Sequence, residues 1–562
     1  MAEASRVLRP GPQSLDELCS WPLTVVQSLV SAKDGNDGER FSRLKALLGR
    51  GLWIDSDYSG IAGEHEVMHQ MVEALNLVAS GSGVEALKDV KIVHGRFCDK
   101  AKQQQQVLRF ISSLHNNSIC VFDDLNDRLP ETARAVLDNM TPKQKISSKE
   151  AADLYRNMSE RIRANAWFMT DAAVVKDAET SETDQTMLSP SPLSSQSESS
   201  LSTRHVRRKL FASESELDCP VSRSIAEEET ERPHAIWASE RVARAEQGLE
   251  DFMISECTPR YPVQEKLSAL ENTHDVFSIV LSPMMLGWPV RRTRVFTCAL
   301  NRETMAWFGP PASEISAHFM QFFERSVATT GDICLAANDA EVRACLCEMA
   351  RKRGFELPEN VPLENVQLHH IYAPGQMVRL QSYEQDRQRH LAETVEVDHA
   401  AVGALSAVDG GPSAWFADLE QNLGQGASTP SEMLPSALTH GTLHAWSANR
   451  PVLPMEQFLA HGFNVFPDRS KWKRACLITD ALSDFSSCQQ KKLLGNGWHL
   501  PVIASWMFYI MAHTVKLDRS VSRQPERTLL RKGGSSFSIG QGSSTPDLSL
   551  AADSQDASVQ DE

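Results

Sequence analysis

A turn of small residues links an apolar stretch to a helical pattern over residues 51–64. Tyr58, Gly60 and Gly63 lie in this turn. In an open α/β sheet such a turn stands at the carboxyl edge of a strand, where a nucleoside can approach the bare backbone. Gly60 and Gly63 would allow that approach, and the ring of Tyr58 would stack on an adenine. A strand–glycine–helix turn also forms for packing alone, so both interpretations stand at this point.

Two acidic residues follow the next two apolar runs. Asp99 closes the run 90–98, and Asp124 follows the run 119–122. A carboxylate at the first position can accept hydrogen bonds from both ribose hydroxyls, and one at the second can meet the adenine amino group. Aspartate also caps strand ends where no ligand binds. Taken together, the glycine turn and the two acids resemble the nucleotide site of a class I methyltransferase.

Four further blocks carry polar residues at strand ends or in turns, and their order in the chain is informative. They resemble, one after another, the Glu-Asn-Val motif, the Gly-x-Pro-Gln-x-Arg-x-Arg motif, the Arg-x-Leu-x-x-x-Glu segment and the late Gly-Asn motif of the cytosine-5 DNA methyltransferase family. The glycine turn resembles the opening Asp-x-Phe-x-Gly-x-Gly block of that family. The four blocks are 251–259 with Glu256, 282–296 with Arg292 and Arg294, 449–463 with Glu456, and 493–501 with Asn496.

The resemblance extends over residues 51–130 and 205–515 and depends on the order of the blocks. Literal Glu-Asn-Val tripeptides occur at 359–361 and 364–366. Both follow the arginine block, which is the wrong order, so we interpret them as coincidences.

The resemblance implies methylation of cytosine C5 in DNA with S-adenosyl-L-methionine as cofactor. A cysteine thiolate adds to C6 of a flipped base, while an acid holds a proton at N3 and an arginine stabilises the charge at O2. Glu256 matches the acid, Arg292 and Arg294 match the arginines, and Asn496 would complete the cofactor site. A strand cap for Glu256 and solvated strand positions for the arginines are the alternatives from the residues alone.

The nucleophile is where the sequence departs from the family. Cys219 lies 37 residues before Glu256 and matches the thiol, but a proline follows it, whereas the family has a proline before the cysteine. A shift of about three residues would place Glu216 at that position and leave no thiol. Val290 also replaces the glutamine of the family motif. A catalytically weakened paralogue that binds DNA or regulates a partner is therefore an alternative, as is a tRNA cytosine-5 methyltransferase.

The elements that must position these residues form an α/β fold. The expected architecture is a Rossmann-like class I methyltransferase sheet with helices on both faces, a variable target-recognition subdomain and disordered insertions. The apolar run Leu500–Ala512 is too short to cross a bilayer and predicts a buried helix. The expected segments are an N-terminal extension (1–50), the cofactor-binding half (51–175), a disordered Ser-rich insertion (176–205), the catalytic half (206–300), the variable target-recognition-like region (301–440), the C-terminal motifs (441–515) and a disordered tail (516–562).

Composition limits the class of protein and its partners. The chain has 562 residues, with 57 Lys+Arg against 73 Asp+Glu and a formal net charge of −16. This charge argues against coating nucleic acid by bulk attraction and favours a narrow basic cleft around Arg292 and Arg294.

Cysteine usage and the N-terminal sequence limit the compartment. Eleven scattered cysteines without a CxxC pair fit a reducing compartment and predict no metal site. No secretory or membrane-spanning segment is apparent, so we expect an intracellular protein, nuclear if the source is eukaryotic. The sequence does not predict an oligomeric state.

Overall fold

The computed structural model of the chain divides into two units, Met1–Leu517 and Asp518–Glu562. The residues that the structure describes all belong to the first unit. Tyr58, Cys219, the segment 176–205 and nearly all of the tail 516–562 lie outside the described residues. The described residues are 8–30, 37–57, 60–81, 90, 92–114, 120–122, 124–125, 234, 236–398, 415–421 and 431–517.

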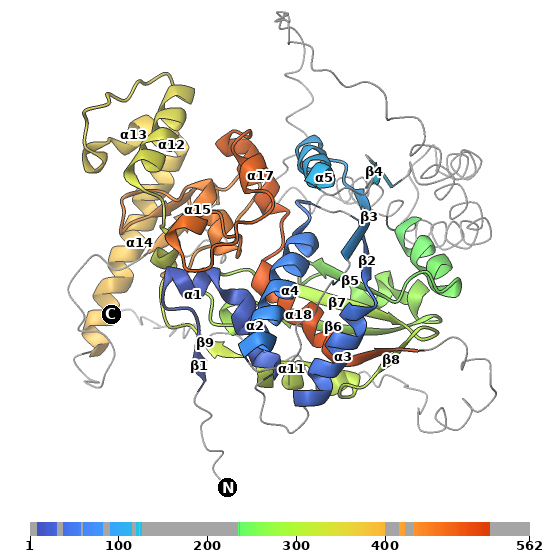
Figure 1. Cartoon of the computed structure of the whole chain (residues 1–562). Coiled ribbons are helices and arrows are strands. Elements are labelled where there is room, and N and C mark those ends of the chain that lie inside the picture. The colour runs from blue at the N-terminus through green and yellow to red at the C-terminus, as the bar shows by residue number, and fades with distance from the viewer. Residues whose placement is uncertain are drawn as a thin grey trace, which may run out of the picture. The chain divides into compact units, whose positions relative to one another are not determined.

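A parallel sheet of three strands forms the predicted nucleotide region (Figure 1). Its strands, in spatial order, are β2 (Leu52–Asp57), β3 (Ile92–Cys98) and β4 (Cys120–Phe122). Helix α4 (Gly63–Gly81) follows β2, and helix α5 (Lys102–Leu114) connects β3 to β4. The apolar positions at helical spacing in α4 are buried against the core. The β-α-β organisation expected from the sequence is thus confirmed here.

A second sheet of three strands contains Glu256 and Arg294, two of the predicted catalytic residues. It contains β5 (Phe252–Cys257), β6 (His274–Leu281) and β7 (Arg294–Asn301), with β7 in the centre and antiparallel to both neighbours. Every residue of β7 after Arg294 is buried, as expected for a central strand covered on both faces. The apolar run in β7 predicts a strand but contains no information on its direction. The whole is a mixed α/β fold, in agreement with the predicted class.

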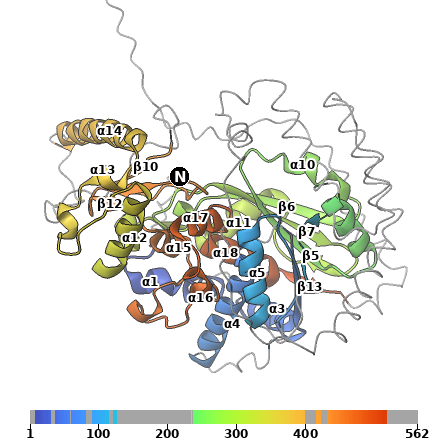
Figure 2. The ribbon, with the colours of Figure 1, turned by 90° about the horizontal axis from the view of Figure 1, so that it is seen from above.

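Helix α18 (Leu500–Ala512) is the centre of the main core, and all 13 of its residues are buried (Figure 2). It packs on α4 and on two N-terminal helices, α2 (Trp21–Val30) and α3 (Asp37–Gly49). The prediction of a buried helix is therefore confirmed. Residues expected as an N-terminal extension (1–50) contribute to the same apolar core as α18.

An N-terminal strand joins the start of the described chain to the block that contains Arg292. β1 (Arg9–Pro10) pairs in parallel with β9 (Arg325–Ser326). The next residue, Gly11, lies against Gly287 so closely that a Cβ on Gly11 would be 2.1 Å from the Gly287 carbonyl oxygen. Glycine is required at this contact, which supports the turn that leads to Arg292.

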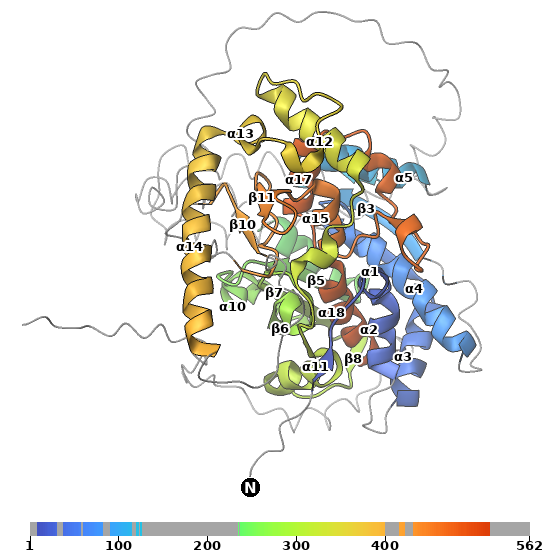
Figure 3. The ribbon, with the colours of Figure 1, turned by 90° about the vertical axis from the view of Figure 1, so that its left-hand side faces the viewer.

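A smaller apolar core lies within the predicted variable region (Figure 3). The helices α12 (Asp339–Lys352), α13 (Leu368–Ile371) and α14 (Pro374–Asp398) contribute to it. So does strand β10 (Phe416–Asp418), through Ala417. It pairs with β11 (Leu443–Ala445) in a small antiparallel sheet, and the apolar residues of β11 belong to the main core. The apolar side chains in this part of the chain thus form a cluster separate from the main core.

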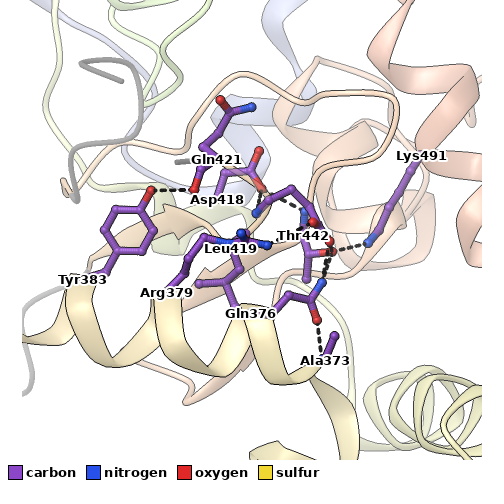
Figure 4. Close-up of polar contacts among 10 residues, drawn as sticks. Ala373, Gln376, Arg379, Tyr383, Asp418, Leu419, Gln421, Thr442 and Lys491 are labelled. Carbon is purple, nitrogen blue, oxygen red and sulfur yellow. Dashed lines mark hydrogen bonds and ion pairs between the residues drawn. The ribbon is translucent and has the colours of Figure 1, made fainter. Parts of the chain in front are cut away.

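Polar contacts join α14 to this small sheet and to helix α17 (Ser487–Gly495) (Figure 4). Arg379 donates through Nε to the carbonyl oxygen of Leu419. The Nε2 atom of Gln376 and the Nζ atom of Lys491 each lie 3.3 Å from the hydroxyl oxygen of Thr442 and donate to it. Helix α14 and the small sheet are thereby linked to the segment that ends in the Gly-Asn-Gly turn.

The remaining elements complete the frame. In the parts of the chain that the structure describes, no helix combines the length and apolarity that a membrane span requires. A helix also spans residues 236–246. The other elements are α1 (Leu15–Cys19), α10 (Val263–Lys266), β8 (Met305–Trp307), α11 (Ile315–Phe323), β12 (Arg450–Pro451), α15 (Pro454–Ala460), α16 (Thr479–Leu482) and β13 (Thr514–Lys516).

Candidate cofactor and catalytic site

Asp99 holds the glycine turn that follows β2. The N–H of Gly60 donates to Oδ2 of Asp99 over 2.9 Å, and the N–H of Ala101 donates to Oδ1 over 2.9 Å. Gly60 has a φ of +54°, a conformation that favours glycine. Burial raises the pKa of Asp99, and the two N–H groups act in the opposite direction. Each carboxylate oxygen has a further lone pair for a ligand hydroxyl.

The Gly-Asn-Gly turn packs directly on this glycine turn. Asn496 caps the C-terminus of α17, and its carbonyl oxygen lies 3.2 Å from the position that a Cβ on Gly60 would take. A Cβ on Gly63 would lie 3.3 Å from Cδ2 of Leu500. Gly60, Gly63, Asp99 and Asn496, four of the predicted cofactor residues, therefore lie together although they come from distant parts of the sequence.

Asp124 lies at the same edge of the parallel sheet. Its strand β4 is in register with β3, with Phe122 opposite Cys98. Cys98 is in turn opposite Asp57 of β2, so the carboxyl ends of all three strands meet. Asp99 directly follows the end of β3, and Asp124 stands two residues after the end of β4. Both predicted acids therefore lie at the carboxyl edge of the parallel sheet.

The predicted catalytic residues Glu256, Arg292 and Arg294 also lie together. Oε1 of Glu256 is 3.1 Å from Nε of Arg294 and 3.9 Å from Nη2 of Arg292. The antiparallel pairing of β5 with β7 brings the carboxyl end of β5 beside the start of β7. The two blocks, separated by an intervening strand in the sequence, thus form one acid–arginine cluster.

Burial changes the pKa values of this cluster. Burial raises the pKa of Glu256, while the positive charges of Arg292 and Arg294 act to lower that pKa. Burial lowers the pKa of Arg292 to about 10, against the attraction of Glu256, so the guanidinium remains a cation at neutral pH. A carboxyl with a raised pKa holds a proton more readily at neutral pH, which is the property that a proton donor needs.

Arg292 connects this cluster to the cofactor residues. Its Nη2 atom donates to the carbonyl oxygen of Gly497 over 2.8 Å, and its Nη1 atom donates to the carbonyl oxygen of Ala437 over 3.4 Å and to the hydroxyl of Ser436 over 3.3 Å. Arg292 is buried, so it cannot line a basic cleft as the sequence predicted. Only Arg294, which is partly exposed, remains available for that role.

Sequence reasoning missed a buried network of charges beside β2. Arg244 pairs with Asp55 at 2.7 Å, and Arg241 pairs with Glu250 at 2.7 Å and with Asp57 at 3.6 Å. The arginines lie on the helix that precedes β5, and the aspartates lie on β2. Arginines spaced along a polar helix are typical of a solvated face, so no pattern identified these partners.

The described cysteines nearest the acid do not have the properties of a nucleophile. Cys257 follows Glu256 directly, and burial raises its pKa to about 11. Burial also raises the pKa of Cys298, on the neighbouring strand. An activated cysteine has a lowered pKa instead. Cys219 stays the predicted nucleophile, on the sequence argument alone.

Comparison with known proteins finds solved structures of low sequence identity and low TM-score. No family model matches the chain, and no curated protein matches its sequence. A DNMT2 mutant of Spodoptera frugiperda has 10% identity over 82% of this chain and 99% of that chain, with a TM-score of 0.32. The S. pombe Dnmt2 methyltransferase has 11% identity over 82% and 98%, with a TM-score of 0.33. The Entamoeba histolytica methyltransferase EhMeth has 12% identity over 82% and 98%, with a TM-score of 0.28.

Proposed function

We propose that the chain is an S-adenosylmethionine-dependent methyltransferase that acts on C5 of cytosine in DNA. One observation carries the proposal: Arg292 contacts both Glu256 and Gly497, and thus links the acid–arginine cluster to the turn that packs on Gly60. Residues from distant blocks of the sequence, predicted to bind the cofactor and to act on the base, lie in one continuous region. A chance set of motif matches gives no reason for such proximity.

The cofactor residues suit an adenosine-bearing ligand. Asp99 has free acceptor capacity on both oxygens, and Asp124 stands at the neighbouring strand end. Gly60 and Gly63 lack side chains where the chain must approach closely. Asn496 would complete the site from the far side. S-adenosylmethionine supplies an electrophilic methyl group when it is bound.

The acid–arginine cluster suits a cytosine ring. Attack of a Cys219 thiolate on C6 would place negative charge on the ring. Glu256, whose pKa is raised by burial, would hold a proton at N3, and Arg294 would donate a hydrogen bond to O2. Arg292 would hold Glu256 from the buried side. C5 then takes the methyl group, loses its proton, and the thiolate leaves C6.

Two alternatives share the same site. A tRNA cytosine would use the same residues, because the ring is identical. A weakened paralogue would keep the cofactor site and lack the thiol, as the order of Cys219 and the following proline permits.

The test combines calorimetry with methyl transfer. S-adenosylhomocysteine should bind the full chain, and the double variant Asp99→Asn with Asp124→Asn should bind at least about 10-fold more weakly. Unchanged affinity in that variant would show that the nucleotide-site assignment is wrong. Transfer of a tritiated methyl group to a DNA duplex supports the proposal. Transfer only to tRNA supports the first alternative, and binding without transfer to either supports the second.

A further inference from the structure

Glu64 is a buried acid in the glycine turn region that the proposed reaction does not use. It follows Gly63 at the start of α4, and its exposed fraction is 6%. The hydroxyl of Ser56 donates a hydrogen bond to its carboxylate. Its Oε1 atom is buried and has no hydrogen-bond partner in the structure. One oxygen of this carboxylate is therefore removed from water without a hydrogen bond that replaces the lost hydration.

The surroundings of Glu64 contain no positive charge that acts on it among the described residues. Its charged neighbour is Asp57, another acid. Every other buried carboxyl in the described part of the chain has a cation acting on it. These pairs are Glu66 with Arg474, Glu240 with Arg241, Glu250 with Arg241, Asp418 with Lys491 and Glu456 with Arg450.

A buried carboxylate is costly unless a cation or several hydrogen bonds compensate it. Burial together with the charge of Asp57 raises the pKa of Glu64 to about 7. An acidic residue in the first turn of a helix does interact favourably with the helix dipole. That interaction requires neither burial nor an unpartnered oxygen, so it does not account for Glu64.

We propose that Glu64 forms the subsite for the positively charged end of S-adenosylmethionine. The inference rests on the proposed function, because it assumes that the turn at Gly60 binds this cofactor. Glu64 lies four residues after Gly60, on the same turn that Asp99 and Asn496 contact. Asp99 and Asp124 would take the uncharged adenosine part. The sulfonium or the ammonium group would then supply the cation that Glu64 lacks.

Glu66 provides a matched control on the same helix. It is also buried, and burial raises its pKa. However, its oxygens accept hydrogen bonds from the N–H of Leu477 at 2.7 Å and from Nε2 of Gln70 at 2.6 Å. Each oxygen of Glu66 thus has a partner within the chain, so a change at Glu66 should affect stability rather than ligand choice.

The test measures the affinity of the full chain for three nucleosides by calorimetry. S-adenosylmethionine carries the sulfonium and the ammonium, S-adenosylhomocysteine carries only the ammonium, and methylthioadenosine carries neither. Glu64→Gln should weaken binding of S-adenosylmethionine by about 10- to 100-fold and leave methylthioadenosine unchanged. Affinity for S-adenosylhomocysteine falls if Glu64 faces the ammonium and is kept if it faces the sulfonium. Glu66→Gln should leave the ratios among the three ligands unchanged.

Three results separate failure of this inference from failure of the proposed function. Equal losses for all three ligands, or no loss at all, would overturn the role of Glu64 and leave the cofactor proposal in place. Absence of binding to the unaltered chain would overturn both. Glu64→Asp restores the charge on a shorter side chain and should recover part of the discrimination, which a merely structural role would not produce.

Discussion

The Nη2 atom of Arg292 donates a hydrogen bond to the carbonyl oxygen of Gly497 over 2.8 Å and lies 3.9 Å from Oε1 of Glu256. One buried guanidinium therefore contacts both the acid proposed to act on the target base and the turn proposed to close the cofactor site. Because Arg292 is buried, a change in its position affects both neighbours. Cofactor binding and the state of Glu256 are thereby expected to be coupled.

Removal of the Arg292 guanidinium should weaken cofactor binding although the residue is not expected to touch the cofactor. Arg292→Met leaves the Gly497 carbonyl without its donor, and we expect about 10-fold weaker binding of S-adenosylhomocysteine in calorimetry. Arg294→Met is the control, because Arg294 contacts Glu256 but not Gly497. Equal affinities of the two variants would contradict the coupling.

Loss of the Glu456 carboxylate should strongly destabilise the fold. Glu456 is fully buried and accepts from both Nη atoms of Arg450, at 2.8 and 2.7 Å, and from the N–H groups of Leu453 and Ala337. Glu456→Ala leaves a largely buried guanidinium and two N–H groups without their acceptor, and should lower the free energy of unfolding by about 3 to 5 kcal/mol.

The matched control for Glu456 is an exposed ion pair. Glu341 pairs with Arg469 at 2.6 Å, and both side chains are partly exposed to solvent. In Glu341→Gln, loss of the pair with Arg469 should lower the free energy of unfolding by at most about 1 kcal/mol. Denaturant unfolding measures this difference. A similar decrease in the free energy of unfolding for the two variants would contradict the stabilising role proposed for the Glu456 contacts.

A methyl group at Gly462 should be poorly tolerated. Gly462 has a φ of +89°, and a Cβ there would lie 2.4 Å from Cδ of Pro501 at the start of α18. Gly462→Ala should therefore lower the free energy of unfolding by about 2 kcal/mol or more. Gly49→Ala is the control, because Gly49 ends α3 with nothing within 4 Å of its Cβ position. A Gly462→Ala protein as stable as the control would contradict the packing described for α18.

The stability of the ligand-free chain should depend on pH through Glu64. Its pKa is raised from 4.5 to about 7, so the folded state keeps this proton to a higher pH than the unfolded state. The stabilising contribution of the proton is complete below about pH 4.5 and is lost as the pH rises through about 7. Glu64→Gln should therefore be about 1 to 3 kcal/mol more stable than the unaltered chain at pH 8, and equally stable near pH 4.5.

Saturating S-adenosylmethionine provides the check on this interpretation. If Glu64 receives a cation from the ligand, the advantage of Glu64→Gln at pH 8 should disappear or reverse, because the ligand then stabilises the charged carboxylate. A variant that has the same pH dependence of unfolding as the unaltered chain would contradict the account of Glu64.

Local sequence patterns predicted the elements better than their partners. The helical spacing of apolar residues in α4 and the continuous apolar run of α18 each determine burial locally, and both predictions are confirmed. The direction of β7 depends on tertiary pairing, which its apolar run does not encode. The burial of Arg292 was missed for the same reason, since Gly497 lies 205 residues away.

The candidate site shows the same division. Block order in the sequence brought Glu256 together with Arg294, and Gly60 with Asp99, and the structure places each pair in contact. The sequence contains no signal for Glu64, because a glutamate at a helix start is typical of ordinary surface helices. Only the absence of a cation around it, which is a property of the fold, identifies it as unusual.

Covalent trapping tests the central claim most directly. A DNA duplex or a tRNA that contains 5-fluorocytosine cannot release the cysteine adduct after methyl transfer, because the fluorine at C5 does not leave as a proton does. With S-adenosylmethionine present, the account predicts a stable adduct whose peptide contains Cys219, and no adduct with Cys219→Ser. Cys257→Ser should leave the adduct in place. A chain that binds the cofactor but forms no adduct with either nucleic acid, or forms it at another cysteine, would contradict the proposed chemistry.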